Sequence, residues 1–368
     1  MSMLDQKWLE DVWEKTEVKL ARTAVSAREI LPYTTENGKW TERSRDWWTN
    51  GFWPGTMWLM YDATGKEDYK ITAERAEVLL DDALKTVSRL HHDVGFMWHL
   101  SAGANYRLTG SQQSFVRNMY AANMLAGRYN IKGGFIRAWN SENAIGWAII
   151  DCMMNIPLLY WASKETGDDR YKYIAMSHAD KTLKYHVRED GSANHIVEYN
   201  PQNGDFVTTY GGQGYCEGSS WSRGQAWALY GFTLSYIHTG EQRYLDAAKK
   251  CANYFIGAVC GDWLPRCDFR APAEPVIYDS SAGLIAANGL LELAKHVGEF
   301  EHDMYYNAGV NLVRAIGDKF ADWSEDTDAI IGYGTESYSG RHHIDMVYSD
   351  FYFVEALNKL KGVNTFLW

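Results

Sequence analysis

Two carboxylates, Asp151 and Asp93, are the candidates for acid–base chemistry in this chain. Asp151 lies within an almost wholly apolar run, AIIDCMMNIP, at residues 148–157. If that run is helical, the residues three and four positions from Asp151 carry no positive charge that could neutralise it. Burial then favours the protonated carboxyl group and raises its pKa, as a general acid at neutral pH requires. The alternative is a buried aspartate that bonds a helix terminus.

Asp93 lies in the segment HHDVGF, residues 91–96, directly before an apolar stretch. An aspartate at such a place is commonly a helix N-cap. The functional alternative is the second member of a carboxylate pair, which would share one proton with Asp151 and separate the two titrations. The two residues are far apart in the sequence, so they meet only if the fold gathers distant segments, as a closed ring of helices would.

Arg223 is the candidate for binding an anionic group. It stands between Trp221 and Trp227, after the glycine-rich stretch GGQGYCEG (211–218) and at the start of an apolar helix. Its planar guanidinium could hold a carboxylate through two parallel hydrogen bonds. A capping or cation–π arginine is the alternative. The glycine-rich stretch lacks the spacing and the lysine of a phosphate loop, which argues against a nucleotide site.

Aromatic side chains are frequent, at 14% of residues, with 16 Trp and 24 Tyr. Flat rings with a polar edge are common partners of sugar faces, so this excess is a first indication of a carbohydrate site. The densest cluster runs from Trp40 to Trp58. Most of its rings are expected to be core, and a few to line a pocket.

The histidine pairs at 91–92 and 342–343 do not predict a metal site. Adjacent histidines point in different directions, and no motif of the H-E-x-x-H kind accompanies them. The second pair ends a donor-rich segment, SYSGRHH, at residues 337–343. We expect this segment to be a solvated turn, with contact to a second sugar or a sulfate as the alternative.

The charge balance excludes several classes of function. With 36 Lys+Arg against 47 Asp+Glu the formal net charge is −11, and no basic stripe is present that would bind nucleic acid. The 46% of apolar residues suffice for a packed core, which excludes a disordered chain. The longest apolar stretch, residues 144–162, contains Asp151, Asn155 and Pro157, and is expected to be a buried helix rather than a membrane span.

Five cysteines, at positions 152, 216, 251, 260 and 267, form neither an even set nor a C-x-x-C pair. Free thiols in a reducing compartment are the simpler interpretation. Residues 1–20 contain several acidic side chains and lack the apolar core of a signal peptide. We therefore expect a cytoplasmic protein, or a periplasmic one if a signal peptide has been removed.

A weak internal repeat organises the chain: a Thr-Gly pair is followed by polar residues and then by an aromatic one. Its copies begin at residues 64, 109, 166 and 239, and a degenerate copy runs from 298 to 305. A glycine directly after an apolar periodic run ends a helix in the left-handed conformation, so each copy predicts the bend of an αα-hairpin. The periodicity predicts about twelve helices, over residues 4–21, 52–63, 69–90, 96–108, 111–128, 145–164, 168–186, 224–238, 242–259, 280–297, 302–321 and 351–361.

Helices that follow a bend carry charges on one face, whereas their partners are apolar nearly all round, which indicates outer and inner helices. Only residues 192–210 alternate as strands do, around the turn PQNG, and predict a small β-hairpin. No linker divides the chain, so we predict one domain over residues 1–368, an all-α (α/α)6 barrel with this hairpin inserted. An open α-solenoid is the alternative, but the bends are spaced too unequally for one.

Several segments, in the same order, resemble the unsaturated glucuronyl hydrolases of glycoside hydrolase family 88. The resemblance implies the (α/α)6 barrel and an enzyme. Such a hydrolase removes the 4,5-unsaturated glucuronic acid that polysaccharide lyases leave at the non-reducing end of glycosaminoglycan-type oligosaccharides. Neither a metal nor an organic cofactor is implied. The segments are WTNGFW (48–53), HHDVGF (91–96), IDCMMNIPLL (150–159), WSRGQAW (221–227), DSSA (279–282) and DFYFVEAL (350–357).

By the same resemblance, Asp151 is the general acid and base, and Asp93 is the second carboxylate of the active site. Asp151 would protonate C4 of the vinyl ether and then take a proton from the water that adds at C5, which differs from ordinary two-carboxylate hydrolysis. Arg223, with Gln213, is expected to hold the uronate carboxylate. The other positions that match the family's sugar pocket are Trp48, Phe52, Trp139, His195 and Trp227.

Two places depart from the family's pattern. Gly212 stands before Gln213 where some members have a histidine, so the hydrogen bonding there must differ. The segment 337–343 does not match the Ser/Lys pattern of members that accept sulfated fragments, and the leaving sugar, its linkage and its sulfation stay open, as does the oligomeric state. Similar donors are nevertheless offered by Ser337, Ser339 and Arg341.

Two other functions are compatible with the fold. An unsaturated rhamnogalacturonyl hydrolase would share the chemistry and act on pectin fragments, but the motifs around Asp93 and Asp151 favour the glucuronyl enzyme. A non-catalytic sugar-binding (α/α)6 protein would keep the aromatic side chains. It would not need both aspartates together with Arg223.

Overall fold

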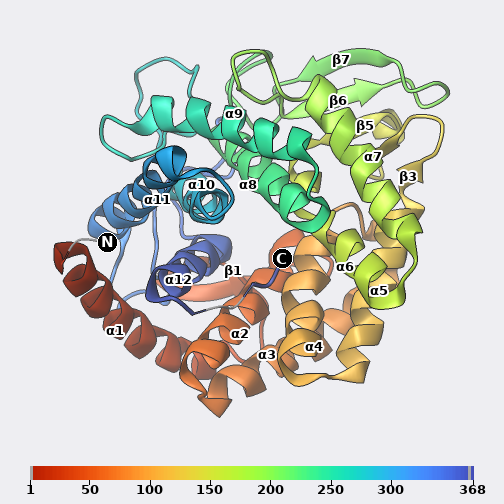
Figure 1. The fold of residues 1–368 in the computed structure, drawn as a ribbon. Coiled ribbons are helices and arrows are strands. Elements are labelled where there is room, and N and C mark those ends of the chain that lie inside the picture. Colours follow the sequence, from red (N-terminus) through yellow and green to blue (C-terminus); the bar gives the residue numbers. More distant parts are fainter. Residues whose placement is uncertain (1–2, 364–365) are drawn as a thin grey trace.

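The helices form two concentric rings in the computed structural model, which describes residues 3–363 and 366–368 (Figure 1). Inner and outer helices alternate along the chain, and α12 packs against both α10 and α2, which closes the inner ring. Over the described residues this is the predicted (α/α)6 barrel. The inner helices are α2 (Phe52–Thr64), α4 (Ala104–Thr109), α6 (Pro157–Thr166), α8 (Ser222–Thr239), α10 (Ser280–Ala294) and α12 (Val347–Lys361). The outer helices are α1 (Met3–Ser26), α3 (Glu67–Leu80), α5 (Gln112–Gly127), α7 (Asp169–Tyr185), α9 (Gln242–Val259) and α11 (Glu299–Phe320).

The four Thr-Gly pairs are the bends between inner and outer helices, as predicted. Their glycines have φ values from 69° to 75°, a region that glycine enters without steric cost. The threonine stabilises the same bend: Thr64 Oγ1 donates to the carbonyl of Met60 and accepts the N–H of Lys66, and the other three threonines repeat this pattern. The degenerate copy differs, because φ of Gly298 is −69° and this residue only precedes α11.

Burial follows the predicted division into inner and outer helices. Every residue of α10 is buried, whereas α9 buries one face and exposes the other. A helix that is apolar all round must be covered on every side, and the outer ring provides that cover. In the part of the chain that the structure describes, no helix has both the length and the apolar character that crossing a membrane requires.

The predicted helix over residues 145–164 is wrong in its first half. Residues Trp147–Ile149 form strand β5, Ile150–Met154 form the 3₁₀ turn η5, and α6 begins only at Pro157. Proline lacks a backbone N–H and is pre-organised for a first helical turn, which explains where α6 starts. Asp151 therefore lies on a turn between a strand and a helix. The helix predicted over 69–90 is also interrupted, because α3 gives way to the 3₁₀ segment η2 (Asp81–Arg89).

The described residues also form three small antiparallel sheets in addition to the helices of the barrel. The predicted hairpin is present as β6 (Ile196–Tyr199) and β7 (Phe206–Tyr210), and β5 adds a third strand to it. A hairpin that was not predicted joins β1 (Pro32–Glu36) to β2 (Lys39–Glu42), and another pair is β3 (Tyr129–Asn130) with β4 (Phe135–Ile136). Asn37-Gly38, both with positive φ, forms the first of these turns and is a strong hairpin signal in any sequence.

An aromatic column fills the centre of the barrel. The side chain of Trp368 is 1% exposed and stacks on Tyr352, while Phe96 and Phe351 meet its ring edge-on. The indole N–H of Trp368 donates to Glu355 at 2.8 Å. Phe96 continues the column, and its ring in turn contacts the rings of Trp48, Phe52 and Trp227.

Replacing Trp368 by alanine is expected to lower the free energy of unfolding by about 3–5 kcal/mol, because a large buried ring is lost and a cavity is left. Urea denaturation measures the change. The control is Phe300→Ala, which removes a fully exposed ring and should change stability by no more than about 0.5 kcal/mol. Equal effects of the two substitutions would contradict a structural role for the column.

Candidate active site

A cavity of about 300 Å³ opens at the end of the barrel where the inner helices begin. Trp48 lies in η1 (Trp48–Gly51) just before α2, and Asp93 lies just before the π-helical η3 (Gly95–Gly103). Asp151 lies in η5 before α6, and Arg223 is in the first turn of α8. The ring therefore brings together side chains that are distant in the sequence. The lining residues are Trp47, Trp48, His91, Asp93, Trp139, Asp151, Gln213, Trp221, Arg223 and Trp227.

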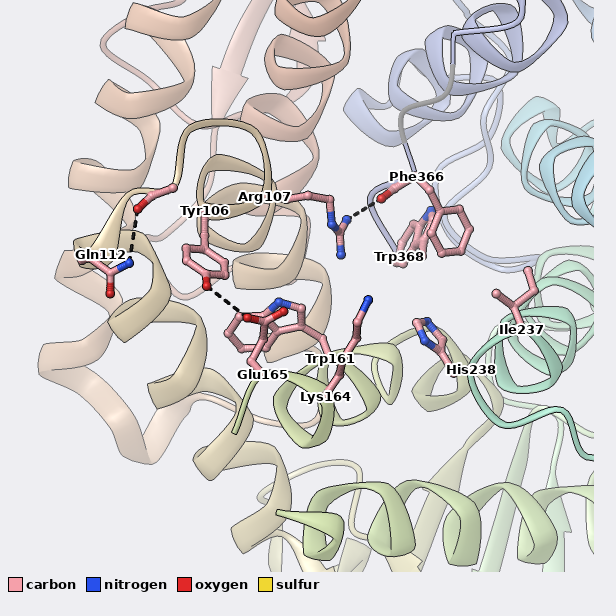
Figure 2. A pocket seen from close by; sticks show the side chains of 11 residues that line it. Tyr106, Arg107, Gln112, Trp161, Lys164, Glu165, Ile237, His238, Phe366 and Trp368 are labelled. Atoms are coloured by element: carbon pink, nitrogen blue, oxygen red, sulfur yellow. Dashed lines mark hydrogen bonds between the residues drawn. The ribbon is translucent and has the colours of Figure 1, made fainter. Parts of the chain in front are cut away.

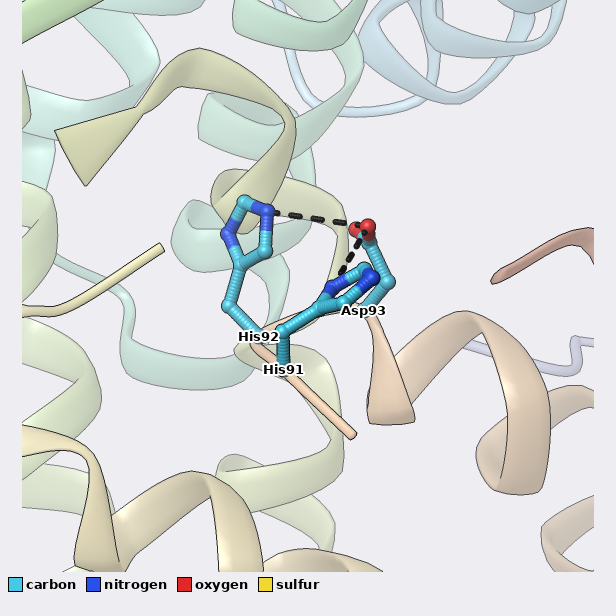
Figure 3. A group of neighbouring side chains, drawn as sticks. All are labelled: His91, His92 and Asp93. Carbon is cyan, nitrogen blue, oxygen red and sulfur yellow. Dashed lines mark ion pairs between the residues drawn. The ribbon is translucent and has the colours of Figure 1, made fainter. Parts of the chain in front are cut away.

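Asp93 and Asp151 both approach the imidazole of His92. His92 Nε2 is 3.6 Å from Asp93 Oδ2 and 3.5 Å from Asp151 Oδ1, so a single nitrogen approaches both carboxyl groups. His91 Nδ1 lies 3.2 Å from the same oxygen of Asp93 (Figure 3). His92 is fully buried and Asp93 is 5% exposed, whereas the side chain of Asp151 keeps 18% of its surface accessible. Of the two carboxyl groups, Asp151 is thus the one more open to a bound molecule.

The surroundings shift the pKa values of the two carboxyl groups in opposite directions. Burial, reinforced by the negative charge of Asp93, raises the pKa of Asp151 well above its ordinary value, and Arg223 offsets only part of this. Burial would also raise the pKa of Asp93, but His92, His91 and the amide of Asn155 outweigh it, so the pKa falls below the ordinary value. One protonated and one ionised carboxyl group at neutral pH is the pairing that divides acid and anion roles.

The charge of His92 agrees with this division. Burial lowers its pKa to about 4, so the ring is neutral at neutral pH. In the acidic range where Asp93 titrates, His92 carries part of a positive charge and favours the Asp93 anion. At neutral pH His92 therefore adds no positive charge to the site, and the charge of Arg223 is paired with Asp279.

Arg223 is buried and held from three directions. Its Nη1 donates to Asp279 and, at 2.6 Å, to the carbonyl of Thr335, and its Nη2 donates to the carbonyl of Glu336 at 2.7 Å. Its guanidinium also lies 4.5 Å from the ring centre of Trp221. Arg223 therefore makes a cation–π contact, which was the alternative interpretation, and also lines the cavity. Three of the five N–H donors are engaged by these bonds, which leaves two for a bound carboxylate.

Gln213 and His195 form a connected wall behind the cavity. The backbone N–H of Gln213 lies 3.0 Å from His195 Nδ1, and the carbonyl of Gly211 lies 3.2 Å from the same nitrogen, so this ring nitrogen connects two points of the glycine-rich segment. The side chain of Gln213 donates to the carbonyl of Glu336 at 2.6 Å. Burial lowers the pKa of His195 to about 3, so the ring is neutral. Gly212 explains the departure from the family's pattern, because a Cβ atom there would lie 2.1 Å from His195 Nδ1.

The structure gathers most of the predicted site residues, but not all of them line the cavity. Phe52 is fully buried beneath Trp48, with ring centres 5.9 Å apart, and His195 packs behind Trp221 at 4.3 Å. Both therefore support the wall rather than form it. Three lining residues were not predicted, and each stands within two positions of a predicted one; they are Trp47, His91 and Trp221.

The segment 337–343 lies beside the site without lining the cavity. The backbone N–H of Tyr338 donates to the carbonyl of Gln213 at 2.8 Å, so the segment is tied to the cavity wall. Arg341 is exposed and paired with Glu336, through Nη2 at 2.6 Å and Nε at 3.1 Å. Ser339 is exposed and Ser337 is half-buried. The guanidinium of Arg341 is thus already neutralised by a carboxylate of the same loop.

His91, His92 and Asp93 are the one group among the described residues whose donor atoms could converge on a metal ion (Figure 3). Their ligand atoms lie within 4.8 Å of one another. The expectation that adjacent histidines diverge is wrong for this pair, since the backbone turns between residues 91 and 93. Two imidazoles and a carboxylate are a possible set for zinc. The two imidazoles, however, already lie beside the Asp93–Asp151 pair.

A larger cavity of about 760 Å³ opens at the opposite end of the barrel, where the inner helices end (Figure 2). Arg107 Nη1 donates there to the carbonyl of Phe366 at 2.5 Å, and the hydroxyl of Tyr106 donates to Glu165 at 3.0 Å. Its walls contain a single carboxylate, Glu165, and none of the predicted site residues. Size therefore does not identify the candidate site, which is the smaller cavity with the paired aspartates.

Comparison with known proteins gives consistent matches. The sequence profile of Glycosyl Hydrolase Family 88 matches residues 20–256. Unsaturated glucuronyl hydrolase from Bacillus sp. (strain GL1) is 36% identical over 332 residues, which cover 87% of this chain and 88% of that protein. Unsaturated chondroitin disaccharide hydrolase from Streptococcus pneumoniae (strain ATCC BAA-255 / R6) is 34% identical over 84% of this chain and 81% of its own. The crystal structure of the Bacillus sp. GL1 enzyme superposes with a TM-score of 0.93 at 32% identity, covering 98% of this chain and 99% of that one.

Replacing Asp93 by asparagine removes a negative charge beside Asp151 and should lower the pKa of Asp151 toward its ordinary value. The titration of the Asp151 carboxyl carbon, followed by ¹³C NMR and assigned by its loss in Asp151→Asn, measures this. Asp180→Asn, on the exposed face of α7, is the control and should leave the titration unchanged. A pKa that stays the same in Asp93→Asn would show that the two carboxyl groups do not interact.

Proposed function

The chain belongs to glycosyl hydrolase family 88, as its motifs indicated, and we propose that it removes 4,5-unsaturated glucuronic acid from the non-reducing end of lyase-generated oligosaccharides. It is thus a glycoside hydrolase. The observation that carries the proposal is the pair Asp93–Asp151, whose carboxyl groups line one cavity and have pKa values shifted in opposite directions. A protonated acid beside an anion is what hydration of a vinyl ether requires.

In the proposed reaction Asp151 is the general acid. Its proton is transferred to C4, the C4–C5 double bond supplies the electron pair, and positive charge develops at C5 and the ring oxygen. The Asp93 anion stabilises that charge through the low-dielectric site. Asp151, now a carboxylate, accepts a proton from the water that adds at C5. The resulting hemiketal opens and expels the rest of the chain, and Asp151 is again protonated.

The same chemistry needs no metal or organic cofactor, because the alkene itself is the nucleophile toward the proton. We therefore propose that His91 and His92 act on the charge of Asp93 rather than as metal ligands. Both rings lie within 3.6 Å of Asp93 Oδ2. A cation on those atoms would neutralise the charge of Asp93, which is one of the causes that raise the pKa of Asp151.

Arg223 is proposed to hold the uronate carboxylate, together with the wall that Gln213 forms. A buried guanidinium with two unused N–H donors fits a planar carboxylate. Because Asp279 balances the charge of Arg223, binding of an anionic sugar would rest on these two directed N–H donors. The small cavity has room for a terminal sugar rather than for a chain passing through it. Trp48, Trp139 and Trp227 supply apolar ring surface around it.

A glycosaminoglycan-type substrate is favoured, since one relative is named as a chondroitin disaccharide hydrolase. The leaving sugar is proposed to approach the loop with Ser337, Ser339 and Arg341. Because Arg341 is already paired with Glu336, an unsulfated leaving sugar is favoured over a sulfated one. Pectin-derived fragments are the alternative substrates, and they enter the assay below.

We also propose a reducing compartment, the cytoplasm, as the site of action. All five cysteines are free, and three of them, Cys152, Cys251 and Cys267, are buried thiols. Cysteines without partners are typical of proteins that do not pass through an oxidising compartment.

The first test follows the ultraviolet absorbance of the conjugated alkene during incubation with unsaturated chondroitin, hyaluronan, heparin and pectin-derived disaccharides. Absorbance should fall with a glucuronyl substrate, and Asp151→Asn should lower kcat by about 10²–10⁴-fold because the proton donor is lost. The rate should decline at high pH as Asp151 loses its proton and at low pH as Asp93 gains one.

Activity should survive dialysis against a chelator, which serves as the control for the proposed absence of a metal. Turnover of the pectin-derived disaccharide alone would replace the proposed substrate with the rhamnogalacturonyl one. Absence of any turnover would leave a sugar-binding protein and contradict the proposed function.

The second test concerns Arg223. Arg223→Lys keeps the charge but loses the planar pair of donors, and it should raise KM by about tenfold to a hundredfold, the range for one hydrogen bond to a charged group. Arg243→Lys, on the exposed face of α9, is the matched control and should leave KM unchanged. Steady-state kinetics on the preferred disaccharide measures both. Wild-type KM in Arg223→Lys would remove the carboxylate-binding role from this residue.

A further inference from the structure

One buried amide joins the two segments that carry the aspartates. Asn155 is 0% exposed and does not line the cavity. Its Nδ2 donates to Asp93 Oδ1 at 3.1 Å and to the backbone carbonyl of Asp151 at 3.2 Å. Its Oδ1 accepts the backbone N–H of Phe96 at 2.8 Å. A single side chain therefore binds the start of η3 on one side and the turn η5 on the other.

The packing around Asn155 leaves no room for another arrangement. Gly95 lies directly against it, and a Cβ atom on Gly95 would be 2.6 Å from Asn155 Cα and 2.7 Å from its Oδ1. The two segments thus touch through backbone atoms at this point. A longer side chain at 155 would push them apart, and a shorter one would lose the bonds to both.

We propose that Asn155 is a positioning residue of the active site, whose amide fixes the Asp93 carboxylate beside Asp151 and holds η3 and η5 in register. The proposal rests on the proposed function for its kinetic consequences, but not for its structural ones. Asn155 touches no reacting atom. It acts on the reaction only through the orientation and charge of Asp93.

The direction in which Asn155 shifts the pKa of Asp93 follows from its hydrogen bond. A donor to an ionised carboxylate stabilises the anion, so the loss of the Asn155 amide should raise the pKa of Asp93. The other charged or titratable groups that face the pair belong to several elements and remain in place. They are His91, His92, Arg128, Asp151, Cys152 and Arg223.

Two variants of Asn155 separate the donor from the side chain's bulk. Asn155→Asp keeps the size and the acceptor for the Phe96 N–H but replaces the donor toward Asp93 by an oxygen. Asn155→Ala removes all three hydrogen bonds of the side chain. Each should lower kcat by about tenfold to a hundredfold, the range for one hydrogen bond to a charged group, with KM little changed. In each, the acidic limb of the kcat/KM profile should move to higher pH.

Asn358→Ala is the matched control. Asn358 is 1% exposed and donates to the carbonyl of Leu59 at 3.1 Å, far in the sequence from either aspartate. Its removal should lower the thermal midpoint, as Asn155→Ala does, but leave the pH profile unmoved. If Asn155→Ala and Asn155→Asp also leave the profile unmoved, Asn155 is only structural and the proposal is wrong.

A readout that needs no substrate separates this inference from the proposed function. In protein labelled with ¹³C at aspartate carboxyl carbons, the Asp93 resonance is identified by its loss in Asp93→Asn, and its titration midpoint should rise in Asn155→Ala. An unchanged midpoint overturns the inference even if the wild-type enzyme is active. A raised midpoint supports it even if the wild-type protein turns over none of the disaccharides, in which case the proposed function alone fails.

Discussion

The interaction on which the structure depends is the close burial of two carboxyl groups that cannot both be ionised at low cost. Asp93 and Asp151 meet at one nitrogen of His92, which is itself fully buried. The protein assigns the single proton by surrounding each group differently. Asp93 accepts the amide N–H of Asn155 and lies beside His91 and His92, which together hold its pKa down, whereas Oδ1 of Asp151 has no hydrogen-bond partner within the described residues. Burial and the charge of Asp93 raise the pKa of Asp151, so Asp151 is the group that holds its proton to the higher pH.

The ring architecture serves this arrangement by bringing the starts of successive inner helices to one end. Segments before α2, η3, α6 and α8 converge there, and the aromatic column from Trp368 to Phe96 fills the space beneath them. Without that filling, the barrel axis would be a void lined by apolar side chains, which costs stability in proportion to its volume. Phe96 contacts Trp48 and Trp227, which line the cavity, so the packing that stabilises the fold also supports the cavity wall.

The sequence predicted the barrel because its signals are local. Each Thr-Gly bend needs only a positive φ at glycine and a threonine that bonds the carbonyl four residues earlier, and the apolar context of Asp151 is visible in one segment. What could not be predicted depends on tertiary contacts: β5 forms because it pairs with β6 across the chain. The role of Asn155 could not be predicted, because two of its three hydrogen bonds run to residues about sixty positions away. The turn at Asn37-Gly38 could have been predicted, because Asn-Gly between two strands is a local hairpin signal.

The contacts of Arg223 connect the proposed binding of the uronate with the proposed contacts of the leaving sugar, which the sequence places in different segments. The guanidinium is oriented by the carbonyls of Thr335 and Glu336, and Gln213 donates to the same carbonyl of Glu336. These carbonyls belong to the loop whose next residues are proposed to meet the leaving sugar. A change in that loop would therefore alter the orientation of Arg223, the proposed carboxylate-binding group, as well as the proposed contacts of the leaving sugar. Because a buried arginine held by backbone oxygens has few other positions, the proposed assignments imply that the preference for the leaving sugar and the binding of the uronate change together.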